Sequence, residues 1–174
     1  MKSLFFCFIL AFSTQLAFSQ TEPLDTDGDG YRNVSTLDHL LWIAKTWPSH
    51  MYHYEMDNDI DCSETRFWNV GDHDNNPETP DSAMGWEPMF QGQIYHFEYS
   101  FCGQFEGHGH KISNLYINRP VNQYPVGLFS CLEEAQIRNV SMINVDITGH
   151  TFVGALVGFL GNYHFLYGPK RINC

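Results

Sequence analysis

The stretch Ile112-Ser113-Asn114-Leu115-Tyr116-Ile117 decides the fold, because its spacing of apolar residues returns later in the chain. It recurs 25 residues on as Ile137-x-x-Val140-x-Met142, and Val126-Gly127-Leu128-Phe129 recurs 27 residues on as Val153-Gly154-Ala155-Leu156. Such a period is too short for two strands joined by a helix. It predicts a mainly β chain whose repeats form short coils of a right-handed parallel β-helix, or solenoid, with stacked inward side chains. An antiparallel β-sandwich built from the same strands is the alternative.

The chain before the repeats is strongly acidic. The 174 residues hold 20 Asp+Glu against 9 Lys+Arg, a formal net charge of −11. Residues 20–87 contain 15 acidic and three basic side chains, whereas residues 88–174 contain five of each. Nucleic acid is therefore not expected as a partner, because phosphate binding needs clustered positive charge. We divide the chain accordingly into an acidic leader at 20–87 and the β-solenoid repeats at 88–162.

A loop typical of calcium sites opens this leader. In Asp25-Thr26-Asp27-Gly28-Asp29-Gly30-Tyr31-Arg32-Asn33 the carboxylates alternate, and a glycine allows a sharp turn around a cation. We predict a Ca²⁺ site in which Asp25, Asp27 and Asp29 donate side-chain oxygens. Tyr31 would add its backbone carbonyl, and Asn33 a ligand that is direct or through water. Thr36 stands where a full EF-hand loop has a bidentate Glu, so modest affinity is expected. A flexible acidic linker is the alternative.

Two further features of the leader follow this loop. Ser35 is expected to cap one short amphipathic α-helix over residues 37–47, which Pro48 ends. Farther on, Asp72, Asp74 and Asn76 alternate as in the first loop, which raises the question of a second cation. The lack of a glycine at the turning position favours a solvated acidic loop there.

The first 19 residues are expected to be an export signal. They combine Lys2, the apolar run Leu4–Phe12 and the cleavage pattern Ala17-Phe18-Ser19. The run is too short to span a bilayer, and no later segment approaches 18 apolar residues, so we expect a secreted or cell-surface protein without a membrane span in its mature chain. Four cysteines, Cys62, Cys102, Cys131 and Cys174, then remain in an oxidising compartment, where they allow up to two disulfides. Free or opportunistically paired cysteines are the alternative.

The repeats also resemble a known family. The stretch from Phe105-Glu106-Gly107-His108-Gly109-His110 to Pro120, with the two Val-Gly segments, is similar to the GLUG-motif repeats of secreted bacterial surface proteins. The copies in this chain depart from that motif. Ser130 and Ala155 stand where the motif has glycines, Glu106 stands where it has Asp, and His108 stands where it has Asn. The resemblance implies a non-catalytic, adhesin-like β-solenoid. Because the family usually continues through more coils, residues 163–174 are interpreted as a divergent tail of a shortened chain, which makes this an N-terminal fragment of a longer repeat protein.

The sequence contains few signs of catalysis. There is no H-E-x-x-H, G-x-S-x-G or glycine-rich phosphate loop, and His108 with His110 lacks a nearby third zinc ligand. The leading hypothesis is therefore an exported, calcium-stabilised interaction scaffold that binds a surface glycan or protein and is not an enzyme. The alternative is a carbohydrate-active β-helix, a polysaccharide lyase or glycosidase, that uses a pair such as Glu98 and Glu106 as acid and base.

Overall fold

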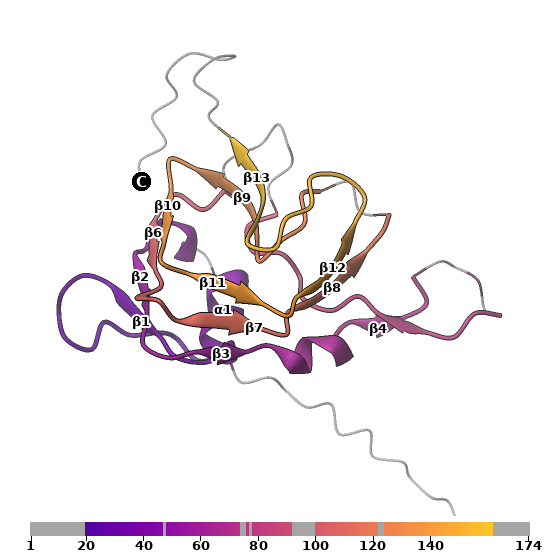
Figure 1. The fold of residues 1–174 in the computed structure, drawn as a ribbon, viewed down its shortest axis with the longest axis horizontal. Coiled ribbons are helices and arrows are strands. Elements are labelled where there is room, and N and C mark those ends of the chain that lie inside the picture. Colours follow the sequence, from indigo (N-terminus) through magenta and orange to yellow (C-terminus); the bar gives the residue numbers. More distant parts are fainter. Residues whose placement is uncertain are drawn as a thin grey trace, which may run out of the picture.

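The computed structural model describes residues 20–46, 48–73, 76, 78–91, 100–121 and 124–161. Within these ranges the chain is mainly β, with one α-helix and several parallel sheets (Figure 1). The expected signal at 1–19 and the tail at 163–174 lie outside the described residues. The helical elements are α1 (Leu37–Lys45) and the short 3-10 helices η1 (Ser49–Met51) and η2 (Ser63–Phe67).

The strands are short and follow one another through brief connections. The strands before residue 100 are β1 (Arg32–Val34), β2 (Tyr54–Met56), β3 (Ile60–Asp61), β4 (Val70–Gly71) and β5 (Ser82–Ala83). Those after it are β6 (Gln104–Glu106), β7 (Lys111–Ser113), β8 (Tyr116–Arg119), β9 (Phe129–Glu133), β10 (Gln136–Arg138), β11 (Ser141–Ile143), β12 (Asp146–Gly149) and β13 (Val157–Gly161).

Parallel pairing stacks these strands in layers. The longest sheet has the order β1-β2-β6-β10, beside it lies β11-β7-β3, and β12 pairs with β8 and β13 with β9 (Figure 1). Every one of these pairs is parallel, and only β4 with β5 is an antiparallel pair of named strands in the described ranges. We call residues 104–133 the middle layer and residues 136–161 the last layer. The antiparallel β-sandwich is therefore wrong for these strands.

The register between the two layers differs from the one expected from the repeat. Ile112 lies opposite Met142, and Ile137 lies opposite Phe105. Ile112 therefore faces a residue five positions beyond Ile137, and Ile137 faces a residue seven positions before Ile112. The reason is that apolar residues recur at 137, 140, 142, 145 and 147, so the same pattern matches at two alignments. The other half of the prediction is confirmed, because Val126 bridges Val153 in parallel.

One continuous core runs through the layers. Tyr54, Phe105 and Phe129 are almost fully buried, and the ring of Phe105 pairs with the rings of the other two. Ile112 and Ile117 are fully buried between the neighbouring strands. Strands of the acidic leader and of the repeats share the first sheet, since β2 pairs with β6 across the boundary drawn at residue 87. Cys62 and Cys131 are free and buried, and Cys102 is disulfide-bonded, so two disulfides do not form.

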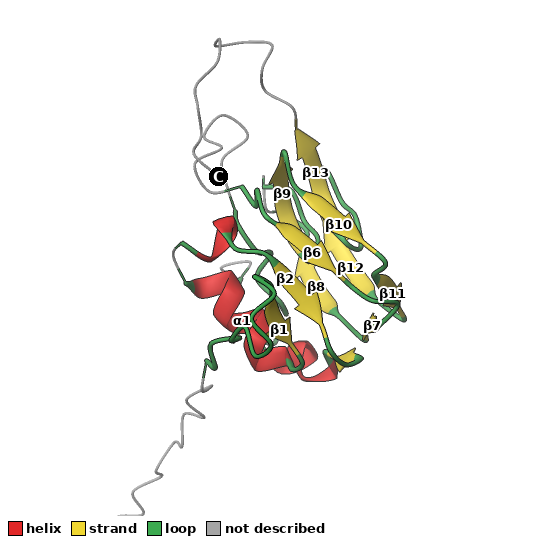
Figure 2. Cartoon of the chain, turned by 90° about the vertical axis from the view of Figure 1, so that its left-hand side faces the viewer, coloured by secondary structure: helices red, strands yellow, loops and turns green. Residues whose placement is uncertain are grey.

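The helix α1 covers one end of the stack. Its Leu40 and Ile43 are fully buried in the core, and Figure 2 shows α1 beside β1, on the side away from β11 and β13. Its N-cap is Thr36, whose Oγ1 accepts a hydrogen bond from the His39 N–H at 3.2 Å. The expected cap at Ser35 is wrong, because Ser35 lies one residue too early and its hydroxyl donates to Asp57 at 3.4 Å. The described helix ends at Lys45.

Candidate functional site

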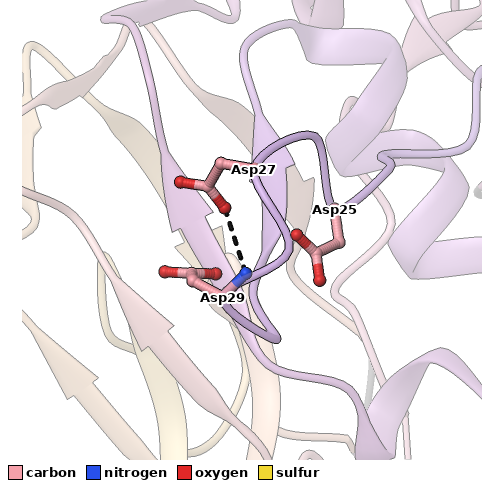
Figure 3. Close-up of side chains that lie close together, drawn as sticks. All are labelled: Asp25, Asp27 and Asp29. Carbon is pink, nitrogen blue, oxygen red and sulfur yellow. Dashed lines mark hydrogen bonds between the residues drawn. The ribbon is translucent and has the colours of Figure 1, made fainter.

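The three aspartates of the first loop converge. One oxygen from each of Asp25, Asp27 and Asp29 lies within 4.8 Å of the others, and all three side chains are exposed (Figure 3). Among the described residues, this is the one group of three or more His, Cys, Asp or Glu side chains close enough together to hold a metal ion. Two oxygens on opposite sides of a calcium ion lie about 5 Å apart, because each Ca–O distance is about 2.3–2.6 Å. The spacing and the hard oxygen donors therefore fit Ca²⁺, with room for water on the exposed side.

The loop holds this shape by hydrogen bonds to its own backbone. Gly28 and Gly30 adopt φ values of 83° and 94°, which glycine reaches without a steric penalty. Their N–H groups donate to the two oxygens of Asp25 at 2.7 and 3.0 Å. The Asp29 N–H donates to Asp27 at 3.2 Å, the bond drawn in Figure 3, and the Tyr31 N–H donates to Asp29 at 2.8 Å. Each carboxylate oxygen keeps a second lone pair for a cation.

Asn33 anchors the loop to the sheet. Its side chain is buried, and its Oδ1 accepts hydrogen bonds from both the N–H and the hydroxyl of Thr26, each at 2.8 Å. Its Nδ2 donates to Glu55 at 2.7 Å and to Asp57 at 3.1 Å. The structure therefore brings together the three predicted aspartates but turns the predicted ligand Asn33 toward the sheet. Asn33 positions the loop through these bonds.

The fifth predicted ligand, Tyr31, also contacts the sheet. Its hydroxyl donates to Gln104 Oε1 at 2.7 Å, and its ring lies 5.5 Å from the ring of His53. A ligand role through its backbone carbonyl stays a prediction.

A polar pocket adjoins the loop on the outer face of the sheet β1-β2-β6-β10. Its volume is about 150 Å³. Strand alternation creates it, because Tyr54 and Phe105 point into the core and their neighbours point outward. The lining residues are Asp29, Tyr31, Glu55, Gln104, Phe105, Glu106, His108, Gln136 and Arg138. Sequence reasoning missed Glu55, although its position between the apolar residues Tyr54 and Met56 was a usable signal of an outward-facing strand residue.

Two carboxylates of this pocket, Glu55 and Glu106, already have hydrogen-bond partners. His108 Nε2 lies 2.9 Å from Glu55 Oε2, and this contact raises the pKa of His108. The side-chain amide of Asn139 donates to Glu106 at 2.8 Å, and the His108 N–H donates to the same oxygen at 3.0 Å. These two bonds lower the pKa of Glu106, so its carboxylate stays ionised at neutral pH. An ionised Glu106 is unsuited to act as a general acid.

The other candidate residues are not brought together. His108 contacts Glu55, whereas His110 Nδ1 lies 3.1 Å from Asp59, so the two imidazoles lie against different carboxylates. In the second acidic loop, Asp72 accepts a hydrogen bond from the Asn76 N–H at 3.2 Å. Asp74 and Glu98 lie outside the described residues.

Comparisons with known proteins give partial similarities. The chain is 29% identical over 127 residues to halomucin of Haloquadratum walsbyi, an alignment that covers 72% of this chain and 1% of halomucin. It is 29% identical over 129 residues to a Gly-rich membrane protein of Evansella cellulosilytica, over 72% of this chain and 13% of that protein. No family model matches the sequence, and no solved structure matches it. Among the described residues, no helix has the length and apolarity needed to cross a bilayer. The chain thus corresponds to a small part of two much longer proteins.

Proposed function

We propose that this protein is an exported, non-catalytic β-helix that serves as an adhesin-like interaction scaffold at the cell surface and is stabilised by calcium. The observation that carries the proposal is the parallel stacking of β6 through β9 beneath β10 through β13 over one buried core. Parallel strands that return after 28 to 32 residues without a helix between them are the pattern of a solenoid coil. The similarity to parts of two much longer proteins agrees with a repeat unit.

The polar pocket supports a binding surface more than an active site. Glu55 and Glu106 are register partners on neighbouring strands, which is the arrangement that a carbohydrate-active enzyme would need. Each is already bonded, however: Glu55 to Asn33 and His108, and Glu106 to Asn139. Planar polar side chains on a rigid sheet suit recognition of a glycan or a protein surface.

A polysaccharide panel separates the scaffold from the enzyme. We expect the purified chain to release neither reducing ends nor unsaturated products. Product formation that Glu106→Gln abolishes, and that Glu133→Gln leaves unchanged, would replace the scaffold by the carbohydrate-active β-helix.

Calcium is proposed to fix the acidic loop against strand β1, which directly follows it. Three carboxylates repel one another at this spacing, and a divalent cation cancels that repulsion. Extracellular calcium modules have dissociation constants of about 10⁻⁴–10⁻³ M. Calcium at about 10 mM would then stabilise the folded chain by roughly 1.4–2.7 kcal/mol. The melting temperature would rise by roughly 3–10 °C at this chain length.

Scanning calorimetry with and without calcium tests this role. We expect the rise in melting temperature to disappear in the double variant Asp27→Asn with Asp29→Asn. The matched control, Glu78→Gln with Asp81→Asn, removes two carboxylates from an exposed loop and should keep the full rise. An equal calcium response in both double variants, or no response in the wild type, would remove calcium from the proposal.

A further inference from the structure

The outward side chains of the polar pocket form two rows across neighbouring strands. Glu55, Glu106 and Arg138 are register partners on β2, β6 and β10, which lie side by side in Figure 2. Gln104 and Gln136 are register partners two residues earlier on β6 and β10. Neighbouring strands lie about 4.8 Å apart, and residues two apart on one strand about 6.6 Å apart. The sheet therefore presents carboxylate, amide and guanidinium groups from backbone positions at fixed separations.

Three of these groups have unused hydrogen-bonding capacity. Glu106 Oε1 accepts both of the bonds described above, whereas no described residue donates to Glu106 Oε2. Gln104 and Gln136 use their Oε1 atoms to accept bonds from Tyr31 and Arg138, and neither Nε2 donates to a described residue. One carboxylate oxygen and two amide groups are thus left to bind a ligand, the oxygen as an acceptor and the amides as donors.

The pocket is small and has an aromatic wall. Its volume of about 150 Å³ is below the roughly 300–1,000 Å³ of pockets for drug-sized ligands, so it suits a single small ring. Tyr31 lines the pocket, and its hydroxyl bond to Gln104 at 2.7 Å holds its ring in place. A sugar ring matches this lining. Each sugar hydroxyl can donate to a carboxylate and accept from an amide, and the C–H face of the sugar can pack on an aromatic ring.

The charge of the lining favours an uncharged sugar. The lining holds three carboxylates, those of Asp29, Glu55 and Glu106. Against them stand Arg138 and, when protonated, His108, so the net charge of the described lining is negative in both states of the imidazole. An anionic sugar such as a uronic acid would be repelled. A protein partner would need an interface of about 800 Å² on each side with an apolar centre, whereas this lining is mainly polar.

We propose that the polar pocket binds one neutral hexose residue of a surface glycan. Glu106 Oε2 accepts a hydrogen bond from a sugar hydroxyl, and the side-chain amides of Gln104 and Gln136 donate to sugar oxygens. The inference rests on the proposed scaffold function and deepens it, because it names the class of ligand that the scaffold binds. It does not require calcium, since none of the three binding groups belongs to the acidic loop.

Isothermal titration calorimetry of the purified chain tests the pocket. The probes are six-residue oligosaccharides of glucose, mannose and galactose, with oligogalacturonate as the anionic comparison. We expect one-to-one binding of at least one neutral oligosaccharide and no binding of oligogalacturonate. Glu106→Gln should weaken the binding at least tenfold, because the amide replaces the acceptor Oε2 by a donor and a hydrogen bond to a charged group is lost. Glutamine keeps the Oε1 that accepts the two existing bonds, and circular dichroism confirms that the variant remains folded.

The matched control Glu64→Gln makes the same change on η2, outside the pocket, and should bind like the wild type. Equal affinities of the two variants would place the glycan elsewhere and overturn the proposal. Binding of no neutral oligosaccharide, or of oligogalacturonate alone, would also overturn it and would leave the scaffold function standing. Chromatography of the titrated samples tests the scaffold separately. Shortened oligosaccharides would overturn the non-catalytic scaffold, whereas a tenfold binding defect of Glu106→Gln would still support the pocket as the glycan site.

Discussion

Replacing Gly107 by alanine tests how closely the middle and last layers approach each other. A Cβ atom at Gly107 would lie 2.3 Å from the backbone oxygen of Asn139 and 2.7 Å from Cγ2 of Val140. Ordinary van der Waals contact begins at 3.4 Å, so the two layers would have to separate locally by about 1 Å. Backbone cannot swing aside as the end of a flexible side chain can.

The cost follows from this clash and from the bonds around it. Inserting a methyl group into a well-packed site costs about 1–3 kcal/mol. The separation also stretches the hydrogen bond from the Gly107 N–H to Arg138 at 2.8 Å and the one from the Gly109 N–H to Asn139 at 2.9 Å. Each such bond contributes about 0.5–1.5 kcal/mol. We expect Gly107→Ala to lower the free energy of unfolding by roughly 2–5 kcal/mol and the melting temperature by roughly 4–20 °C.

Urea unfolding followed by circular dichroism measures this loss. The matched control is Gly109→Asn, in the same connection between β6 and β7. A Cβ at Gly109 meets nothing within 4 Å, and its φ of 82° lies in the left-handed region that asparagine tolerates. The control is itself strained by its positive φ and should cost about 1 kcal/mol, because asparagine adopts the left-handed region more readily than other residues with a side chain. If Gly107→Ala costs no more than this control, the layers do not contact each other as described and the stacking argument fails.

Three other predictions concern the core, the pocket and the buried thiols. Leu115→Ala should lower the free energy of unfolding by about 2–5 kcal/mol, because Leu115 is fully buried. The control Leu24→Ala changes a side chain that is 60% exposed and should cost less than about 1 kcal/mol. Equal urea midpoints for the two variants would contradict the burial of Leu115. The contact with Glu55 raises the pKa of His108, so this pair stabilises the fold fully below about pH 6.5 and the contribution is lost as pH rises through the raised pKa. The difference in urea midpoint between wild type and His108→Gln should therefore shrink from pH 5.5 to pH 8, and a constant difference would argue against the pair. Burial raises the pKa of the Cys62 thiol to about 12, so iodoacetamide at pH 8 should label it only after unfolding, and rapid labelling of the native chain would show that its layer opens.

The candidate site was only partly predictable from sequence. The convergence of Asp25, Asp27 and Asp29 followed from alternating carboxylates around glycines, because local hydrogen bonds alone give such a loop its shape. The role of Asn33 did not follow, since its partners Glu55 and Asp57 are distant in sequence and reach it only after β1 pairs with β2. The pairing of His108 with Glu55 required the same knowledge, because the two residues belong to different layers.

For the fold, the sequence by itself determined the kind of structure. Short apolar runs returning after fewer than about 35 residues, with Gly, Asn and Pro between them, leave no room for a crossover helix and so favour strands stacked in parallel. Only the tertiary structure decided which residues face each other. The apolar spacing of residues 137–147 fits two alignments. The connection between β6 and β7 has four residues, whereas the connection between β10 and β11 has two. This difference in length selects the alignment that places Met142 over Ile112. Register depends on the lengths of connections and on contacts between distant residues, and a local pattern of side chains contains neither.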